Sequence, residues 1–265
     1  SVAELMLPYT GRQPQKRHAC IAVNLQGGGG LEIWQYSERK PQLPDFRIQI
    51  ADLGVFAAKI KSRNVKAFHQ EVAAKYDVVS ELQSTPDGKA CFYMLDPFGN
   101  YFQIVEDSYV FVDEKRLAGG VVGAVIGMSD IEKALPVYRD ILGYDTIVYD
   151  KTEVFHDWAM LKGSEQTYRR VLLKHSRKRK GAFANMFGPS TLELVVALER
   201  QPRKIYENRY WGDPGFIQIC YDVTHMQDLK TYCSEKGFPF TVDSCADQSS
   251  FDMGEATGHF TYIED

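Results

Sequence analysis

Short segments of this chain recur in the same order in its two halves, and this repetition constrains the fold more than any other feature. The recurring pairs are LEI at 31–33 with LEL at 192–194, IQI at 48–50 with IQI at 217–219, and YMLD at 93–96 with YIED at 262–265. One interval separates both Gln49 from Gln218 and Asp96 from Asp265. A shared interval and order are the signature of a tandem duplication, so we expect repeated structural units.

The clearest unit lies in the middle of the chain. An apolar run over 121–128 predicts a strand, and the sequence SDIE after it fits a capping box led by Ser129. Apolar residues at helical spacing then predict a helix, which Gly143 would end in the left-handed conformation. The strands expected next cover 144–149, 168–174 and 191–198. The order of elements is therefore βαβββ.

The other units show this order less completely. The second is predicted to open with a strand over 46–51 and a helix over 55–62. The fourth is predicted to open with a strand over 216–223 and a helix over 228–236. The remaining expected strands are 18–25, 31–36, 91–95 and 101–105. The predicted fold class is α+β, with four tandem βαβββ modules that form two pairs.

Composition excludes two classes of protein. Of the 265 residues, 44% are hydrophobic and 25% charged, as in soluble globular proteins, and no run approaches the roughly 18 apolar residues of a membrane span. A net charge of −4 supplies no overall basic field for nucleic acid. Five cysteines without a CxxC pair predict reduced, buried thiols. With no export signal at the start, we expect a cytoplasmic protein.

Three segments carry a family resemblance: DPFGN at 96–100, GAVIGMSDIEKAL at 123–135 and GFIQICYDV at 215–223. They are similar to the vicinal oxygen chelate superfamily, the group of glyoxalases, bleomycin-resistance proteins and extradiol dioxygenases. The resemblance implies a glyoxalase/bleomycin-resistance/dioxygenase-like fold in two domains, 1–115 and 116–265, with the first and last modules incomplete. It also implies that paired modules form a cup, which binds a metal ion or a small ligand. The implied modules are 1–40, 41–115, 116–200 and 201–265.

In that superfamily the metal ligands stand on the first and fourth strands of paired modules, typically as His and Glu. The residues at the matching positions that the chain contains are Glu32, Gln49, Gln103, Glu193 and Gln218. None of these is a histidine. The resemblance therefore implies a partly filled site for a divalent ion such as Fe, Mn, Zn or Ni, or a cup without metal.

Glu193 is the strongest candidate among these positions. Strand alternation places it on one face with Val195, and a carboxylate among apolar side chains needs a metal, a Lys or Arg, or a ligand as partner. If metal binds, the resemblance makes Glu193 both a ligand and the proton shuttle. We predict its cup to include Gln218, although a polar residue of the core is the commoner role for such a glutamine. The expected substrate-binding side chains are His156, Trp158 and Trp34, and a structural role is the commoner one for His156.

Two classes of function remain open. The first is a metal-dependent lyase, isomerase or dioxygenase that binds a small oxygenated molecule by bidentate chelation. The second is a metal-free protein that binds or sequesters a small molecule, as resistance-type members do. A third arrangement has one catalytic and one structural pair. The expected partner is a small molecule, and a homodimer is compatible with the sequence. The basic run at 177–180 is either a solvated loop tip or a means of steering a carboxylate or phosphate toward the cup.

Overall fold

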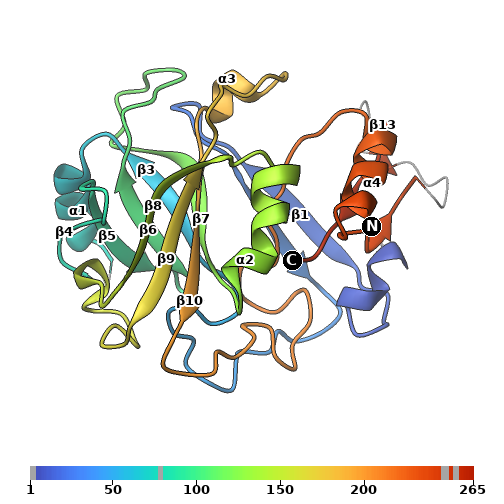
Figure 1. The fold of residues 1–265 in the computed structure, drawn as a ribbon, viewed down its shortest axis with the longest axis horizontal. Helices are drawn as coiled ribbons and strands as arrows, with labels where there is room; N and C mark the ends of the chain where they lie inside the picture. The colour runs from blue at the N-terminus through green and yellow to red at the C-terminus, as the bar shows by residue number, and fades with distance from the viewer. Residues whose placement is uncertain (1–3, 77–79, 246–250, 253–256) are drawn as a thin grey trace.

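A computed structural model describes residues 4–76, 80–245, 251–252 and 257–265. Its centre is one curled mixed sheet in the strand order β4-β5-β6-β3-β7-β10-β9-β8 (Figure 1). The strands are β3 (Gly54–Ser62), β4 (Gln83–Ser84), β5 (Ala90–Leu95), β6 (Tyr101–Glu106), β7 (Ala118–Gly127), β8 (Thr146–Glu153), β9 (Tyr168–Lys174) and β10 (Thr191–Ala197). The predicted α+β class is confirmed.

The sheet consists of two βαβββ units that meet where β3 pairs with β7. These two first strands are antiparallel to each other, and each is parallel to the fourth strand of its own unit, β6 or β10. The helices α1 (Val65–Ala73) and α2 (Ile131–Leu135), the latter continued by the π-helix η2 (Pro136–Ile141), pack on the outer face of the sheet. The inner face is thereby left to enclose a cup.

The start of the second unit differs from the prediction. Residues 54–62 form strand β3, not a helix, and residues 46–51 form a loop instead of the expected strand. An apolar run as short as 55–60 fits either a helix or a strand buried on both faces, and β3 is such a central strand. The helix begins later, where the Asn64 side chain accepts a hydrogen bond from the amide of Ala67.

The start of the third unit is closer to its prediction. The helix is capped by Asp130 and not by Ser129, since the Asp130 carboxylate accepts hydrogen bonds from the amides of Glu132 and Lys133. Gly143 does adopt the left-handed conformation, with φ of 77°. The predicted strand over 168–174 is confirmed as β9, and that over 191–198 ends one residue earlier as β10.

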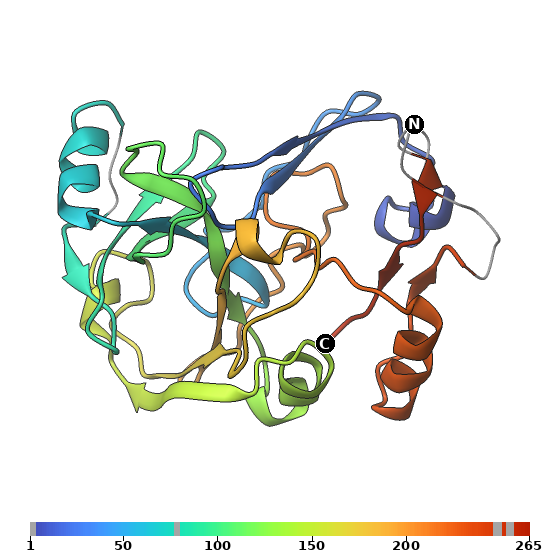
Figure 2. The same ribbon diagram turned by 90° about the horizontal axis from the view of Figure 1, so that it is seen from above.

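Segments from both ends of the chain lie together beside the sheet (Figures 1 and 2), and we call them the flanking layer. The predicted helix over 228–236 is present as α4, whereas residues 216–223 form no strand. The layer consists of η1 (Glu4–Tyr9), β1 (Arg17–Ala22), β2 (Leu31–Tyr36), α4 (Met226–Glu235), β11 (Val242–Asp243), β12 (Phe251–Asp252), β13 (Thr257–Gly258) and β14 (Thr261–Tyr262).

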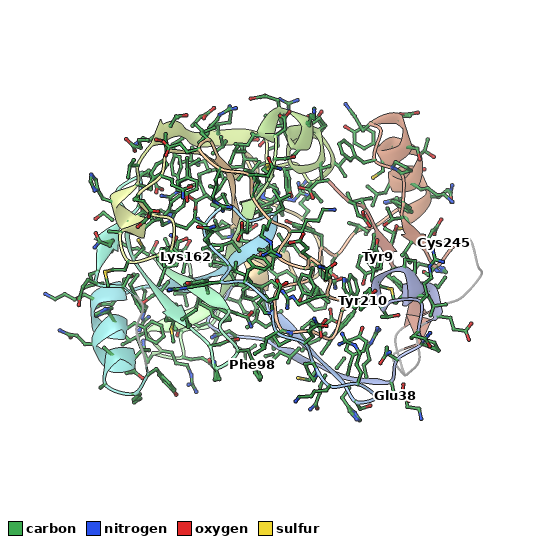
Figure 3. The ribbon with its side chains drawn as sticks, turned by 90° about the horizontal axis from the view of Figure 1, so that it is seen from below. Tyr9, Glu38, Phe98, Lys162, Tyr210 and Cys245 are labelled. Carbon is green, nitrogen blue, oxygen red and sulfur yellow. The ribbon has the colours of Figure 1, made fainter. Side chains whose placement is uncertain are left out.

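An aromatic cluster holds the flanking layer together. The Trp211 ring lies at its centre, stacked on Tyr9 at 4.7 Å and meeting Trp34 and Tyr262 edge-on at 5.5 and 5.2 Å. In Figure 3, Tyr9 and Cys245 mark this side of the molecule, away from Lys162 on the side of the sheet. Contacts between aromatic rings therefore join the two ends of the chain.

Strands from both sides of residue 115, the expected boundary between two domains, belong to this one sheet. Its halves are the second and third predicted units, so strand pairing joins units on both sides of that boundary. The division into domains 1–115 and 116–265 stays a prediction.

All five cysteines are free; Cys91 and Cys233 are buried as expected, whereas Cys20 and Cys220 are exposed. None of the described helices has both the length and the apolar character needed to cross a membrane.

Candidate functional site

Four charged side chains are buried inside the cup. They are Lys59 on β3, Arg170 on β9, Glu193 on β10 and Asp157 on the turn η3 (His156–Trp158), and none is more than 4% exposed. Below them lies an apolar floor that includes Phe56, Tyr168 and Val195. Charges buried this deeply are stable only when each has a partner of opposite charge.

The four charges form one continuous chain, which we call the charge chain. One oxygen of Glu193 binds the Lys59 ammonium, and its other oxygen accepts hydrogen bonds from Arg170 Nε and from the Tyr149 hydroxyl, the latter at 2.6 Å. Arg170 Nη1 also binds Asp157 at 2.7 Å. The Arg170 guanidinium stacks on the Trp158 ring, 3.8 Å from its centroid. Both oxygens of Glu193 are thus engaged by protein donors.

The surroundings of Glu193 fix its protonation state. Burial by itself would raise the pKa of this carboxyl, but the Arg170 and Lys59 cations lower it from 4.5 to about 2. The pKa of Tyr149 is raised, by burial first and then by the Glu193 charge. At neutral pH, Glu193 is therefore a carboxylate that accepts from a neutral tyrosine, and its low pKa makes it a weak general base.

The residues around Glu193 in this cup do not suit a divalent ion. The expected ligand residues Gln103 and Glu193 lie on the fourth strands β6 and β10. In the register of the sheet, Lys59 of β3 pairs with both Gln103 and Gly123. Lys59 is a cation and cannot coordinate while protonated. A side chain in place of Gly123 would overlap the carbonyl oxygen of Thr191, so the close approach of two strands allows no ligand at that position.

Gln103 is the fourth residue of this set. Its side chain is 0% exposed, and among the described residues neither its amide nitrogen nor its amide oxygen has a hydrogen-bond partner. It lies between Lys59 and Tyr93 in the register of the sheet. A buried amide without partners is costly unless water or a ligand group satisfies it. The Gln103 amide can therefore hydrogen-bond to water or to a polar group of a ligand inside the cup.

An open cavity of about 540 Å³ lies above the charge chain. Lys59 and Tyr149 reach its wall from below, and Val105, Val122 and Leu172 supply apolar surface. The end of β9 supplies Lys174, and the connection to β10, which carries the helix α3 (Ala184–Phe187), supplies Arg177, Lys178 and Arg179. A concave, partly apolar space of this size with a few converging polar groups is typical of small-molecule sites.

The other expected ligand residues lie elsewhere. Gln49 is in the loop before β3, where the next residue, Ile50, donates its amide to the Lys162 carbonyl. Glu32 is exposed, and its carboxylate lies 3.9 Å from the Cys220 thiol, which accepts a hydrogen bond from Gln218 at 2.9 Å. The structure therefore groups Gln218 with Glu32 in the flanking layer and not with Glu193. Among the described residues, no three His, Cys, Asp or Glu side chains could jointly hold a metal ion.

The expected substrate-binding side chains are also dispersed. His156 is exposed, beside a separate shallow hollow next to Leu82. Trp158 is 1% exposed in the floor of the cup, where its indole donates to the Tyr93 hydroxyl at 2.8 Å. Trp34 belongs to the aromatic cluster, beneath the Arg17 guanidinium at 4.1 Å. A role in substrate binding stays a prediction for all three.

Sequence reasoning did not select Lys59, Tyr149 or Arg170. Lys59 interrupts an apolar run, which is the signal that could have identified it once that run was read as a strand. Arg170 lies two residues after Tyr168 in β9, so strand alternation puts both side chains on the face of the sheet that carries the apolar floor. Glu193 therefore has the partners that a buried carboxylate was expected to need, and these are the Lys59 and Arg170 cations and the Tyr149 hydroxyl.

Several solved structures are similar to this chain at low sequence identity. A putative dioxygenase from Bacillus subtilis matches with a TM-score of 0.52 and 13% identity, over 93% of this chain and 69% of that one. Glyoxalase I from Zea mays matches with a TM-score of 0.41 and 12% identity, over 65% of this chain and 50% of that one. A Streptomyces coelicolor methylmalonyl-CoA epimerase variant matches with a TM-score of 0.31 and 18% identity, over 55% and 97% of the two chains.

The match to the Bacillus subtilis protein has a TM-score above 0.5 and confirms the expected glyoxalase/dioxygenase-like fold; at 13% identity it shows the fold alone. The chain spans about half the length of the Zea mays enzyme. No protein-family profile matches the chain. No curated protein matches it either.

Proposed function

We propose that this chain, which has the glyoxalase and dioxygenase fold, binds a small oxygen-bearing molecule in its cup without a metal ion. The observation that carries the proposal is the position of Lys59. Its ammonium is bound to Glu193, the carboxylate that would otherwise hold the ion, and it also forms part of the cavity wall. Lys59 therefore supplies, as part of the protein, the positive charge that a metal would bring.

Lys59 can also hold a ligand directly. A lysine ammonium has three donors, and its hydrogen bond to Glu193 uses one of them. Because Lys59 forms part of the cavity wall, its remaining donors are available to a carboxylate or carbonyl oxygen in the cavity. The apolar wall beside it would cover the carbon skeleton of such a ligand.

The alternative is a metal-dependent lyase, isomerase or dioxygenase, and the residues present do not favour it. A divalent ion would need the Glu193 oxygens, which Lys59, Arg170 and Tyr149 occupy. It would also lie beside two fixed cations, and repulsion between like charges opposes its binding.

Oxalate is a suitable probe because its two adjacent oxygens can chelate a metal or bind an ammonium. We expect oxalate to bind the protein after treatment with a chelator, as measured by isothermal titration calorimetry. In Lys59→Met its dissociation constant should rise by at least about tenfold, since one charge-assisted contact is lost. Lys16→Met removes an exposed lysine outside the cavity and should leave the dissociation constant unchanged.

The opposite result is well defined. If oxalate binds only after a divalent ion is added back, or if Lys59→Met binds it as tightly as the unaltered protein, the cup does not work as proposed. Circular dichroism of each variant establishes that it is folded before its affinity is compared.

A further inference from the structure

The charges around the cavity are unbalanced. Its wall carries six lysine and arginine side chains against three carboxylates, although the whole chain has a net charge of −4. Apart from Lys59, the basic side chains of the wall are Lys89, Lys174, Arg177, Lys178 and Arg179. We call these five the basic wall. Positive charge that is concentrated here on an acidic protein marks the cavity as a place for an anion.

The carboxylates of the cavity are already engaged by the protein. Asp87 accepts a hydrogen bond from the Thr85 hydroxyl at 2.7 Å, and Glu106 accepts one from the Ala90 amide. Asp107 lies 3.8 Å from the Lys61 ammonium. These three acidic groups are thus partly neutralised or hydrogen-bonded within their own side of the cavity.

The basic wall has no such partners. Within the part of the chain that the structure describes, none of its five side chains forms an ion pair with an Asp or Glu. Arg177, Lys178 and Arg179 are consecutive, so their charges repel one another at short range. An anion of high charge in the cavity would relieve this repulsion, whereas a single carboxylate would neutralise little of it.

We propose that the cavity binds a small molecule that carries a phosphate group, with the phosphate against the basic wall. The inference rests on the proposed function, because the remainder of that molecule would extend toward Lys59. A phosphate carries close to two negative charges at neutral pH and matches the planar donor fork of an arginine. A volume of about 540 Å³ suits a small ester. A nucleic-acid strand is longer than this cavity and would also meet the opposing carboxylates.

The test compares glycerol phosphate with lactate, a carboxylate of similar size, at equal ionic strength. Two double variants remove the same total charge from the full chain. Arg177→Gln/Arg179→Gln alters the basic wall, and Lys40→Gln/Arg47→Gln alters exposed cations outside the cavity. We expect glycerol phosphate to bind more tightly than lactate. Its dissociation constant should rise by at least about tenfold in the first double variant and stay within about twofold in the second.

His175 gives a second measurement, because it lies in the cavity wall between Lys174 and the arginines. Burial, together with the Arg179 charge, lowers the pKa of His175 below its usual value. A phosphate held beside it favours the charged imidazolium, so this pKa should rise when glycerol phosphate is added. Nuclear magnetic resonance titration of the imidazole measures the change.

Three results would overturn the inference. They are equal affinity for glycerol phosphate and lactate, equal affinity of the two double variants, or a single-stranded oligonucleotide that binds more tightly than the ester. The proposed function fails on different results. It is wrong if oxalate binds only in the presence of a metal ion, or if Lys59→Met does not weaken oxalate binding. If glycerol phosphate binds to the basic wall without metal, this inference is supported whatever effect Lys59→Met has on oxalate binding.

Discussion

The cup and the flanking layer carry the same repeated glutamate in different surroundings. Glu193 is 0% exposed and receives two cations and a tyrosine hydroxyl, whereas Glu32 is exposed with a thiol 3.9 Å away. The sequences around them, LEL and LEI, are nearly identical. The difference shows that the neighbouring strands, more than the local sequence, determine what a repeated position does. Only in the cup do β3, β8 and β9 bring donors to it.

The two regions also differ in what stabilises them. The cup has a charge chain over an apolar floor, and the flanking layer has an aromatic cluster around Trp211. Ion pairs respond to pH and to loss of one partner, whereas stacked rings respond to loss of area. Substitutions that act on only one of these interactions separate the two regions.

The largest difference is expected from removal of the two glutamates. Glu193→Ala leaves Lys59 and Arg170 buried without their shared partner, which should lower the free energy of unfolding by about 3–5 kcal/mol. Glu32→Ala removes an exposed side chain and should cost less than about 0.5 kcal/mol. Urea unfolding of both variants measures the difference. Equal losses would mean that the charge chain does not stabilise the cup.

The next effect is a loss of stability in acid. The pKa of Glu193 is about 2 in the folded protein against 4.5 as its ordinary value, so its stabilising contribution is complete above pH 4.5 and disappears as the pH falls toward 2. The shift corresponds to about 3 kcal/mol. The pKa of Asp157 is instead raised, by burial first, and this carboxyl acts in the opposite direction.

Glu193→Gln isolates the contribution of Glu193 to that profile. The free energy of unfolding of Glu193→Gln should change less between pH 4.5 and pH 2 than that of the unaltered protein, because the variant lacks the titratable carboxyl of Glu193. Glu32→Gln serves as the matched control and should leave the profile unaltered. Identical profiles for all three proteins would contradict a depressed pKa at Glu193.

The smallest effect compares one tryptophan from each region. Trp158→Phe removes the donor to the Tyr93 hydroxyl in the floor of the cup and should cost about 2 kcal/mol, from lost area and a lost buried hydrogen bond. Trp211→Phe keeps an aromatic ring in the flanking layer and should cost about 1 kcal/mol, from lost area. Thermal unfolding measures both, and the reverse order would contradict this account of the two regions.

Much of the fold could be predicted because local signals and global structure agree in the third unit. The helical spacing before Gly143 and the strands over 168–174 and 191–198 need no information from elsewhere in the chain. The second unit was harder, since residues 55–62 are apolar enough for a helix or a central strand. This segment forms a strand because it pairs with β6 and β7, which are distant in sequence.

The candidate site was predictable only in part. The burial of Glu193 and its need for a partner follow from the alternation of β10. The identity of that partner does not, because Lys59 lies in another unit and meets Glu193 through the curvature of the sheet. Likewise, Gln218 was expected beside Glu193, and the structure places it near Cys220 and Glu32.

Elemental analysis tests most directly whether the charge chain stands where a metal ion would. The purified full-length protein and its Glu193→Gln variant are each incubated with Fe, Mn, Zn and Ni salts, passed through a desalting column and analysed. We expect neither protein to retain a stoichiometric ion at the cup, so their metal contents should be the same. One ion per chain in the unaltered protein, lost in Glu193→Gln, would contradict the metal-free cup.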